Sequence, residues 1–210
     1  MKLYLIGGLG ADERVFNYLR LDSETQIIKW IDPKPKEKLK DYSIRLLQQI
    51  NQDEEFGILG VSFGGIIAIE ISKLIKPKKL ILVSSVETSA QLPQTYISIG
   101  KTQVLNLIPN QLIKPPKPLL GFLFGAKNKR LLKQIINDTE PEFIRWALNT
   151  IINWSNQETP IEAIRIHGTK DKLIPLKGEA IEINDGGHFM IVDRAEEISK
   201  LINEQIKYAG

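Results

Sequence analysis

Short apolar runs alternate with segments of helical periodicity along most of the chain. The runs are Lys2–Ile6, Gln26–Ile31, Phe56–Val61, Lys79–Ser84, Ala163–His167 and Glu179–Ile183. The first, third and fourth are nearly continuous in Leu, Ile, Val or Phe, which is typical of strands covered on both faces. Helical patterns occupy Ala11–Leu19, Glu37–Asn51, Phe63–Ile75 and Ala195–Tyr208. This alternation predicts an α/β fold with a parallel sheet and right-handed crossovers.

The alternation stops between Glu87 and Thr159, where several helical segments are separated by prolines and no strand pattern is found. A helical insert at the C-terminal edge of a parallel sheet would lie over the place where such sheets bind ligands. We therefore expect residues 1–86 and 160–210 to form the core domain and residues 87–159 to form a helical cap. The alternative is that these helices simply cover one face of the sheet.

The clearest helix of this insert is "TEPEFIRWALNTIINW", residues 139–154. Thr139 and Glu142 have the spacing of a capping box, with Pro141 in the first turn. One face of the predicted helix is apolar at helical spacing. Its members are Phe143, Ala147, Ile151 and Trp154.

Composition and charge exclude several classes of protein. A chain of 210 residues with 42% hydrophobic and 25% charged residues suits a single globular domain with a well-buried core. The net charge of +3 is too small to indicate a nucleic-acid partner. No apolar segment approaches the roughly 20 residues that span a bilayer, and the N-terminus lacks the pattern of a signal peptide. We therefore expect a cytoplasmic protein without a membrane span.

The chain contains no cysteine and only two histidines, His167 and His188. Disulfides, thiolate metal sites and cysteine nucleophiles are thereby excluded. Two histidines leave little for a transition-metal site, and we expect neither a metal nor a cofactor.

The segment Gly60-Val61-Ser62-Phe63-Gly64 separates a buried strand from a buried helix. A serine on so sharp a turn is held in a strained conformation with its hydroxyl exposed, and the residues two before and two after it must be small. The helix N-terminus behind Ser62 offers N–H groups where an oxyanion could form. A nucleotide-binding loop is disfavoured, because neither glycine-rich segment matches a P-loop or a dinucleotide fingerprint. The pattern favours a nucleophile elbow.

A serine hydroxyl needs a base to take its proton. His188 lies in "INDGGHFMIVDRA", just after the last predicted strand, and Asp171 lies on the loop that leaves the preceding strand. The order Ser62, Asp171, His188 is the nucleophile–acid–base order of one fold that carries this triad. Glu87 and Asp185 remain alternative acids.

With these motifs in order, the sequence resembles proteins of the α/β-hydrolase fold over nearly the whole chain. The motifs are "LIGGLGAD", "GVSFGG", "IHGTKDKLIP" and "GGHFMI". The resemblance implies Ser62 as nucleophile, His188 as general base and acid, and Asp171 as the group that orients the histidine. It also implies oxyanion donors from the backbone N–H groups of Leu9 and Phe63.

By the same resemblance, His167 matches a residue that shapes the acid loop.

The chain departs from the family in two respects. Many members have a histidine where Gly7 stands, which leaves open how the oxyanion loop is supported. The chain also starts on the strand that carries this loop, so we expect a fold without the first two strands of the family. We expect a doubly wound, six-stranded, all-parallel sheet with a helical cap insertion.

The expected activity is that of a serine hydrolase that cleaves an ester or thioester of a small, mostly apolar substrate through an acyl-enzyme. Its partners would be an acyl substrate and water, and the sequence leaves the oligomeric state open. Trp146, Phe124 and Trp154 are candidates for the substrate walls, although each is also a candidate for the core. The alternatives are C–C or amide bond hydrolysis, a lyase, or a binding or receptor protein with little turnover. An intact Ser-Asp-His set argues against a pure binder.

Overall fold

The computed structural model describes residues 1–102, 104–159 and 161–207. Its centre is a six-stranded sheet in the order β2-β1-β3-β4-β5-β6, and every neighbouring pair is parallel. The strands are β1 (Lys2–Ile6), β2 (Thr25–Ile27), β3 (Phe56–Val61), β4 (Lys79–Val83), β5 (Ala163–Gly168) and β6 (Ile181–Ile183). The expected all-parallel, six-stranded sheet is confirmed.

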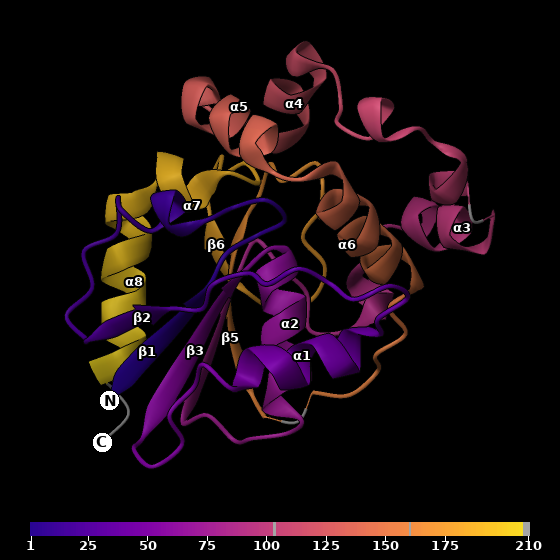
Figure 1. Cartoon of the computed structure of the whole chain (residues 1–210). Helices are drawn as coiled ribbons and strands as arrows, with labels where there is room; N and C mark the ends of the chain where they lie inside the picture. Colours follow the sequence, from indigo (N-terminus) through magenta and orange to yellow (C-terminus); the bar gives the residue numbers. More distant parts are fainter. Residues whose placement is uncertain (103, 160, 208–210) are drawn as a thin grey trace.

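Helices cover both faces of this sheet (Figure 1). One layer contains α1 (Leu39–Leu47) and α2 (Phe63–Ser72), and the opposite layer contains α7 (Met190–Asp193) and α8 (Ala195–Lys207). The alternation of β1 explains the two layers, because Leu3 and Leu5 join the core cluster under α8 while Tyr4 and Ile6 join the cluster under α2. The last helix matches the prediction to Lys207, and Tyr208 lies outside the described residues.

The described residues between β4 and β5 form helices, 3₁₀ turns and irregular connections, and no strand. They include α3 (Gln94–Thr102), α4 (Lys117–Phe124), α5 (Lys129–Asp138) and α6 (Pro141–Asn153), with the short 3₁₀ turns η2 (Ser89–Gln91), η3 (Val104–Leu107) and η4 (Asn110–Leu112). Figure 1 shows α4 and α5 above the end of the sheet at which the strands finish, and α6 beside α2. The apolar face expected on α6 is confirmed, because Phe143, Ala147 and Trp154 are buried and Ile151 packs against the same cluster.

The helix predicted over Ala11–Leu19 is wrong. Only the 3₁₀ turn η1 (Glu13–Val15) forms there, and its neighbours continue in short three-residue bonds such as that from the Leu19 N–H to the Phe16 carbonyl. The apolar spacing arises because Val15 and Phe16 are buried in the core. The burial of these two residues in a turn therefore produced an apolar spacing like that of a helix.

The capping box predicted at Thr139 is also wrong. α6 begins at Pro141 with Glu140 as its N-cap residue, and no side chain bonds to its first turn as a cap. Thr139 instead ends α5, where its hydroxyl lies 2.7 Å from the Ile135 carbonyl and 3.2 Å from the Gly10 carbonyl. Proline at N1 has no N–H to satisfy, so this helix starts without a side-chain cap.

Candidate active site

Ser62 lies at the turn between β3 and α2, next to the point where the strand order reverses between β1 and β3. Its backbone has φ 53° and ψ −120°, a conformation that residues other than glycine rarely adopt. A Cβ at Gly60 would lie 2.5 Å from the Gly64 carbonyl oxygen, and one at Gly64 would lie 2.2 Å from the Gly7 carbonyl oxygen. Both flanking glycines are therefore required by close approach of the backbone.

Hydrogen bonds fix the strained Ser62 peptide on both sides. The Ser62 N–H donates to the Val83 carbonyl at 2.9 Å, and the Ser62 carbonyl accepts from the Gly65 N–H at 2.9 Å. The Ser85 hydroxyl donates to the same carbonyl at 2.7 Å. Sequence reasoning missed Ser85. Its position just beyond β4, the strand next to β3, was the signal that could have found it.

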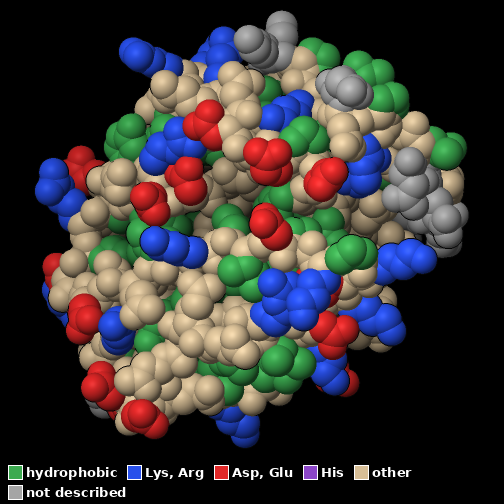
Figure 2. All heavy atoms as spheres, viewed as in Figure 1, with side chains coloured by type: hydrophobic (Ala, Val, Ile, Leu, Met, Phe, Trp, Pro, Cys, Tyr) green, Lys and Arg blue, Asp and Glu red, His purple; other side chains and the backbone are tan. Residues whose placement is uncertain are grey.

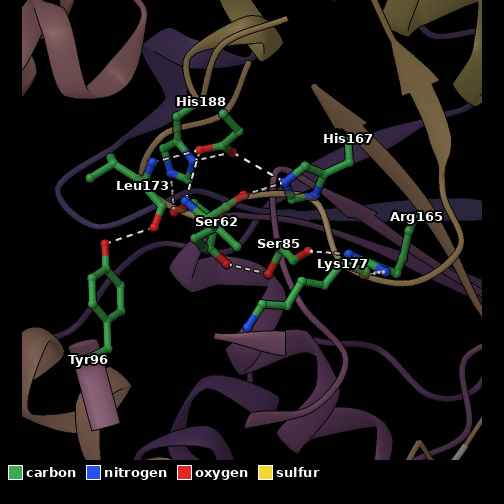
Figure 3. Close-up of polar contacts among 10 residues, drawn as sticks. Ser62, Ser85, Tyr96, Arg165, His167, Leu173, Lys177 and His188 are labelled. Carbon is green, nitrogen blue, oxygen red and sulfur yellow. Dashed lines mark hydrogen bonds and ion pairs between the residues drawn. The ribbon is translucent and has the colours of Figure 1, made fainter. Parts of the chain in front are cut away.

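The structure brings Ser62, His188 and Asp171 into one hydrogen-bonded chain, of which Figure 3 labels Ser62 and His188. The Ser62 Oγ lies 2.8 Å from the His188 Nε2, and the His188 Nδ1 lies 2.7 Å from the Asp171 Oδ2. A carboxylate only accepts hydrogen bonds, so Nδ1 carries the proton and Nε2 is free to accept from the serine hydroxyl. His188 and Asp171 are buried, and Ser62 is partly exposed.

Asp171 is held in its ionised form. Burial by itself would raise its pKa, but the charge of His188 and hydrogen bonds from His167, His188 and the Ile174 N–H outweigh it, so the pKa lies well below its usual range. The other oxygen, Oδ1, accepts from the N–H groups of Leu173 and Ile174 at 3.0 and 2.9 Å. These bonds leave Oδ2 directed at the two histidines.

His167 approaches the same carboxylate from the end of β5. Its Nε2 lies 2.7 Å from the Ile174 carbonyl oxygen and 3.4 Å from the Asp171 Oδ2. Both neighbours are acceptors, so Nε2 carries a proton and fixes the tautomer. The ring is fully buried and its Nδ1 has no hydrogen-bond partner among the described residues. His167 therefore ties the start of the acid loop to its end, and it does not contact Ser62.

The glycine-rich loop after β1 lies directly against Ser62. A Cβ at Gly8 would come within 3.2 Å of the Ser62 Cβ. The next residue, Leu9, lines the cavity at Ser62. A Cβ at Gly7 would lie only 2.3 Å from the Ala11 carbonyl oxygen. That carbonyl is turned over Gly7 and accepts from the indole N–H of Trp30 at 3.0 Å. The loop thus has its own support in a chain without a side chain at position 7.

A cavity of about 280 Å³ opens at Ser62 and His188. Core residues such as Leu9, Phe63 and Leu173 form its floor, and residues of α4, α5 and α6 form its roof. Among the described residues that line it, the polar side chains are those of Ser62, Tyr96 and His188, and there is no Lys, Arg, Asp or Glu. The Tyr96 hydroxyl donates to the Leu173 carbonyl at 2.9 Å and connects α3 to the acid loop.

Of the three aromatic residues expected to contact substrate, only Phe124 lines this cavity. Its ring stands edge-on to the His188 ring, with the centroids 5.5 Å apart. Trp146 and Trp154 are not among the residues that line it, and they pack in the core cluster on the other side of α6. The Trp146 indole donates to the Glu37 carbonyl and the Trp154 indole to the Glu70 carboxylate. These polar partners could not be inferred from the apolar pattern.

Neither alternative acid approaches His188. Asp185 is exposed and pairs with Lys170 at 2.6 Å. Glu87 lies beside Gln91, whose side chain bonds to the Glu87 backbone and carboxylate. Asp171 is the carboxylate in contact with the histidine.

A metal-binding cluster and a membrane-spanning helix are both absent from the residues described. No cluster of three or more His, Cys, Asp or Glu side chains is arranged to hold a metal ion. Across residues 1–102, 104–159 and 161–207, no helix combines the length and apolarity needed to cross a membrane.

Comparison with known proteins shows the fold. No family model matches the chain, and no curated protein matches it in sequence. Among solved structures, an esterase from Thermogutta terrifontis is 15% identical, with a TM-score of 0.68 over 100% of this chain and 90% of its own. A structure from work on carboxylesterases of Nitrososphaera gargenis is 13% identical, with a TM-score of 0.72 over 99% and 90%.

A meta-cleavage product hydrolase from Pseudomonas fluorescens is 16% identical, with a TM-score of 0.67 over 100% of this chain and 92% of its own. The chain therefore has the α/β-hydrolase fold. At this level of identity the likeness shows the fold alone, because neighbours with different reactions match equally well.

Proposed function

We propose that this protein is a serine hydrolase that cleaves an ester or thioester of a small apolar acyl group. The observation that carries the proposal is the chain of hydrogen bonds from Ser62 through His188 to Asp171, ending at an apolar cavity. A binding protein would have no use for a buried, ionised carboxylate that fixes the tautomer of a histidine beside a strained serine.

In the proposed mechanism the Ser62 Oγ attacks the acyl carbon while its proton passes to the His188 Nε2. Asp171 stabilises the resulting imidazolium through the bond to Nδ1. The backbone N–H groups of Leu9 and Phe63, the latter at the first turn of α2, would donate to the oxyanion. His188 then protonates the leaving group, and water cleaves the acyl-enzyme by the same proton transfers in reverse order.

The size and lining of the cavity limit the acyl group. At about 30 Å³ for each water-sized group, a volume of about 280 Å³ accommodates about nine non-hydrogen atoms. The lining offers no charged side chain that would bind a carboxylate or phosphate on the acyl group. We therefore infer short to medium acyl chains and no second charged group at the acyl end.

A fluorophosphonate probe tests the reaction. The wild-type protein should be labelled covalently, and Ser62→Ala, which leaves the fold intact, should not be labelled. Absence of labelling in folded wild-type protein would show that the serine is not activated.

A series of p-nitrophenyl esters and the matching acyl thioesters then tests the pocket. We expect kcat/KM to rise with chain length and to fall beyond about eight carbons, when the cavity is full. Equal turnover of acetate and hexadecanoate esters would contradict the inferred pocket.

A further inference from the structure

Charge is distributed unevenly along the chain. Residues 88–137 contain seven Lys or Arg residues and no Asp or Glu. The remaining 160 residues contain 21 basic and 25 acidic residues, so the small net charge of the protein conceals a strongly cationic segment. This segment includes α3, α4 and nearly all of α5, and each of these helices contributes residues to the lining of the cavity.

The basic side chains of α5 face outward. The inner face of the helix is buried through Leu131, Leu132, Ile135 and Ile136. The outer face presents Lys129, Arg130 and Lys133, all exposed, and the exposed Lys127 precedes the helix. The helix is therefore amphipathic with a cationic outer surface.

The neighbouring helix α4 is apolar on both sides. Leu120, Leu123 and Phe124 line the cavity, while Leu119 and Phe122 are 44% and 61% exposed. Two leucines in the turns before this helix are also exposed to solvent: Leu107 is 82% exposed and Leu112 is 70% exposed. A globular protein rarely leaves so many large apolar side chains exposed along one segment unless the surface has a partner.

A basic group and an exposed apolar group are in contact at one point of this part of the molecule. Lys172, next to Asp171 on the acid loop, places its ammonium 3.4 Å from the centre of the Phe122 ring. In Figure 2, basic and hydrophobic side chains follow the upper edge of the molecule, where α4 and α5 lie, and the acidic side chains begin below it. We call the surface formed by Leu107, Leu112, Leu119, Phe122 and the exposed cations of α5 the cap surface.

We propose that the cap surface docks on an anionic lipid surface. Its composition, leucine and phenylalanine beside lysine and arginine, is that of segments that lie in a membrane interface. The lysines and arginines match the negative charge of such a surface, and the absence of acidic residues from 50 consecutive positions lowers the repulsion that would oppose docking. An acidic protein would also match the charge, but it would not of itself account for the three exposed leucines and the exposed phenylalanine.

Docking would have a direct consequence for the cavity. α4 would contact the lipid with Leu119 and Phe122 and lines the cavity with Leu120 and Phe124, so only the width of this helix would separate the lipid from the cavity. This part of the inference rests on the proposed function, whereas lipid binding itself does not require catalysis.

Vesicle flotation with the full chain tests the proposal. The protein should bind vesicles of equal parts phosphatidylcholine and phosphatidylglycerol, and not vesicles of phosphatidylcholine alone. Lys129→Gln with Arg130→Gln should weaken the partition coefficient about 25-fold, since each cation contributes about 1 kcal/mol near such a surface. Leu119→Ser with Phe122→Ser should weaken it by about tenfold or more.

Matched controls distinguish the effect of the cap surface from the effect of the total charge of the protein. Lys40→Gln with Lys200→Gln removes two exposed cations from other parts of the molecule and should leave binding within about twofold. Ser62→Ala should bind as the wild type does, so loss of activity and loss of docking are read separately. Hydrolysis of a dissolved short-chain ester should be unchanged in the Lys129/Arg130 variant.

Three results would overturn the proposal. The first is failure of the wild type to bind phosphatidylglycerol vesicles at low salt. The second is binding that survives Leu119→Ser with Phe122→Ser and is competed fully by soluble polyglutamate, which would identify the cap surface as a site for an acidic macromolecule. Equal binding by the cap variants and the Lys40/Lys200 control would likewise refute it.

Discussion

Adding one methyl group at Gly7 should disable the oxyanion loop while leaving the Ser62–His188–Asp171 chain in place. The new Cβ would lie 2.3 Å from the Ala11 carbonyl oxygen, and real Cβ atoms do not come closer than 3.0 Å. The carbonyl must therefore retreat. Since it is the acceptor for the Trp30 indole at 3.0 Å, its retreat lengthens or breaks that bond.

Two costs follow from this movement. Overpacking and the loss of one hydrogen bond should lower the free energy of unfolding by about 1–3 kcal/mol. A shift of the Leu9 N–H by a few tenths of an ångström to 1 Å should lower kcat by about 10- to 100-fold, because one oxyanion donor is misplaced. KM should change little, since the donor acts mainly in the transition state.

The assay is steady-state hydrolysis of p-nitrophenyl butyrate, with urea unfolding on the same samples. Gly121→Ala is the matched control, because a Cβ there meets only the Lys129 side chain at an ordinary 3.5 Å and lies within α4. It should keep wild-type kcat and should not destabilise. A Gly7→Ala protein with wild-type kcat would refute the argument that the Ala11 carbonyl holds the loop.

Two other substitutions test the acid and the elbow. Asp171→Asn should lower kcat by about four orders of magnitude, and the free energy of unfolding of the variant should approach that of the wild type below about pH 4. The sign follows from the lowered pKa of Asp171: its ionised form adds stability above the unfolded pKa of about 3.9, and this is lost as the pH falls through the lower folded value. Urea unfolding at pH 7 and pH 3 measures this, and a constant difference between the two proteins would contradict it. Ser85→Ala removes the hydroxyl that donates to the Ser62 carbonyl. It should lower the free energy of unfolding by about 1 kcal/mol and kcat by about tenfold. An unchanged rate of fluorophosphonate labelling would show that this bond does not position the serine.

The parts of the fold that the sequence predicted best are those where one physical requirement dominates. The strands Lys2–Ile6 and Phe56–Val61 were predicted to the residue, because burial on both faces leaves little but apolar residues. The elbow was equally readable, since Gly60 and Gly64 are required by backbone contacts shorter than 3 Å. Where several requirements compete, as at Thr139 and in Ala11–Leu19, local pattern did not decide the structure.

The candidate site likewise contains residues that the sequence could predict and residues that it could not. Side chains with specialised chemistry, Ser62, Asp171 and His188, could be selected from the sequence because few residues of their kind stand at strand ends. The residues that hold them, such as Ser85 and Trp30, act through backbone carbonyls that lie far away in the sequence. Nothing in an amino-acid pattern marks such an acceptor, so these contacts required the structure.

The strain at Ser62 can be measured by comparing two inactive variants. Both Ser62→Ala and Ser62→Gly remove the hydroxyl, but only alanine keeps a Cβ at φ 53° and ψ −120°. Such a conformation costs a residue other than glycine about 1–3 kcal/mol, while glycine loses about 0.4–1 kcal/mol through the greater freedom of its unfolded chain. Ser62→Gly should therefore be the more stable of the two by about 1 kcal/mol in urea unfolding. At an unstrained position the order would be reversed, so a more stable Ser62→Ala would show that the elbow stores no strain.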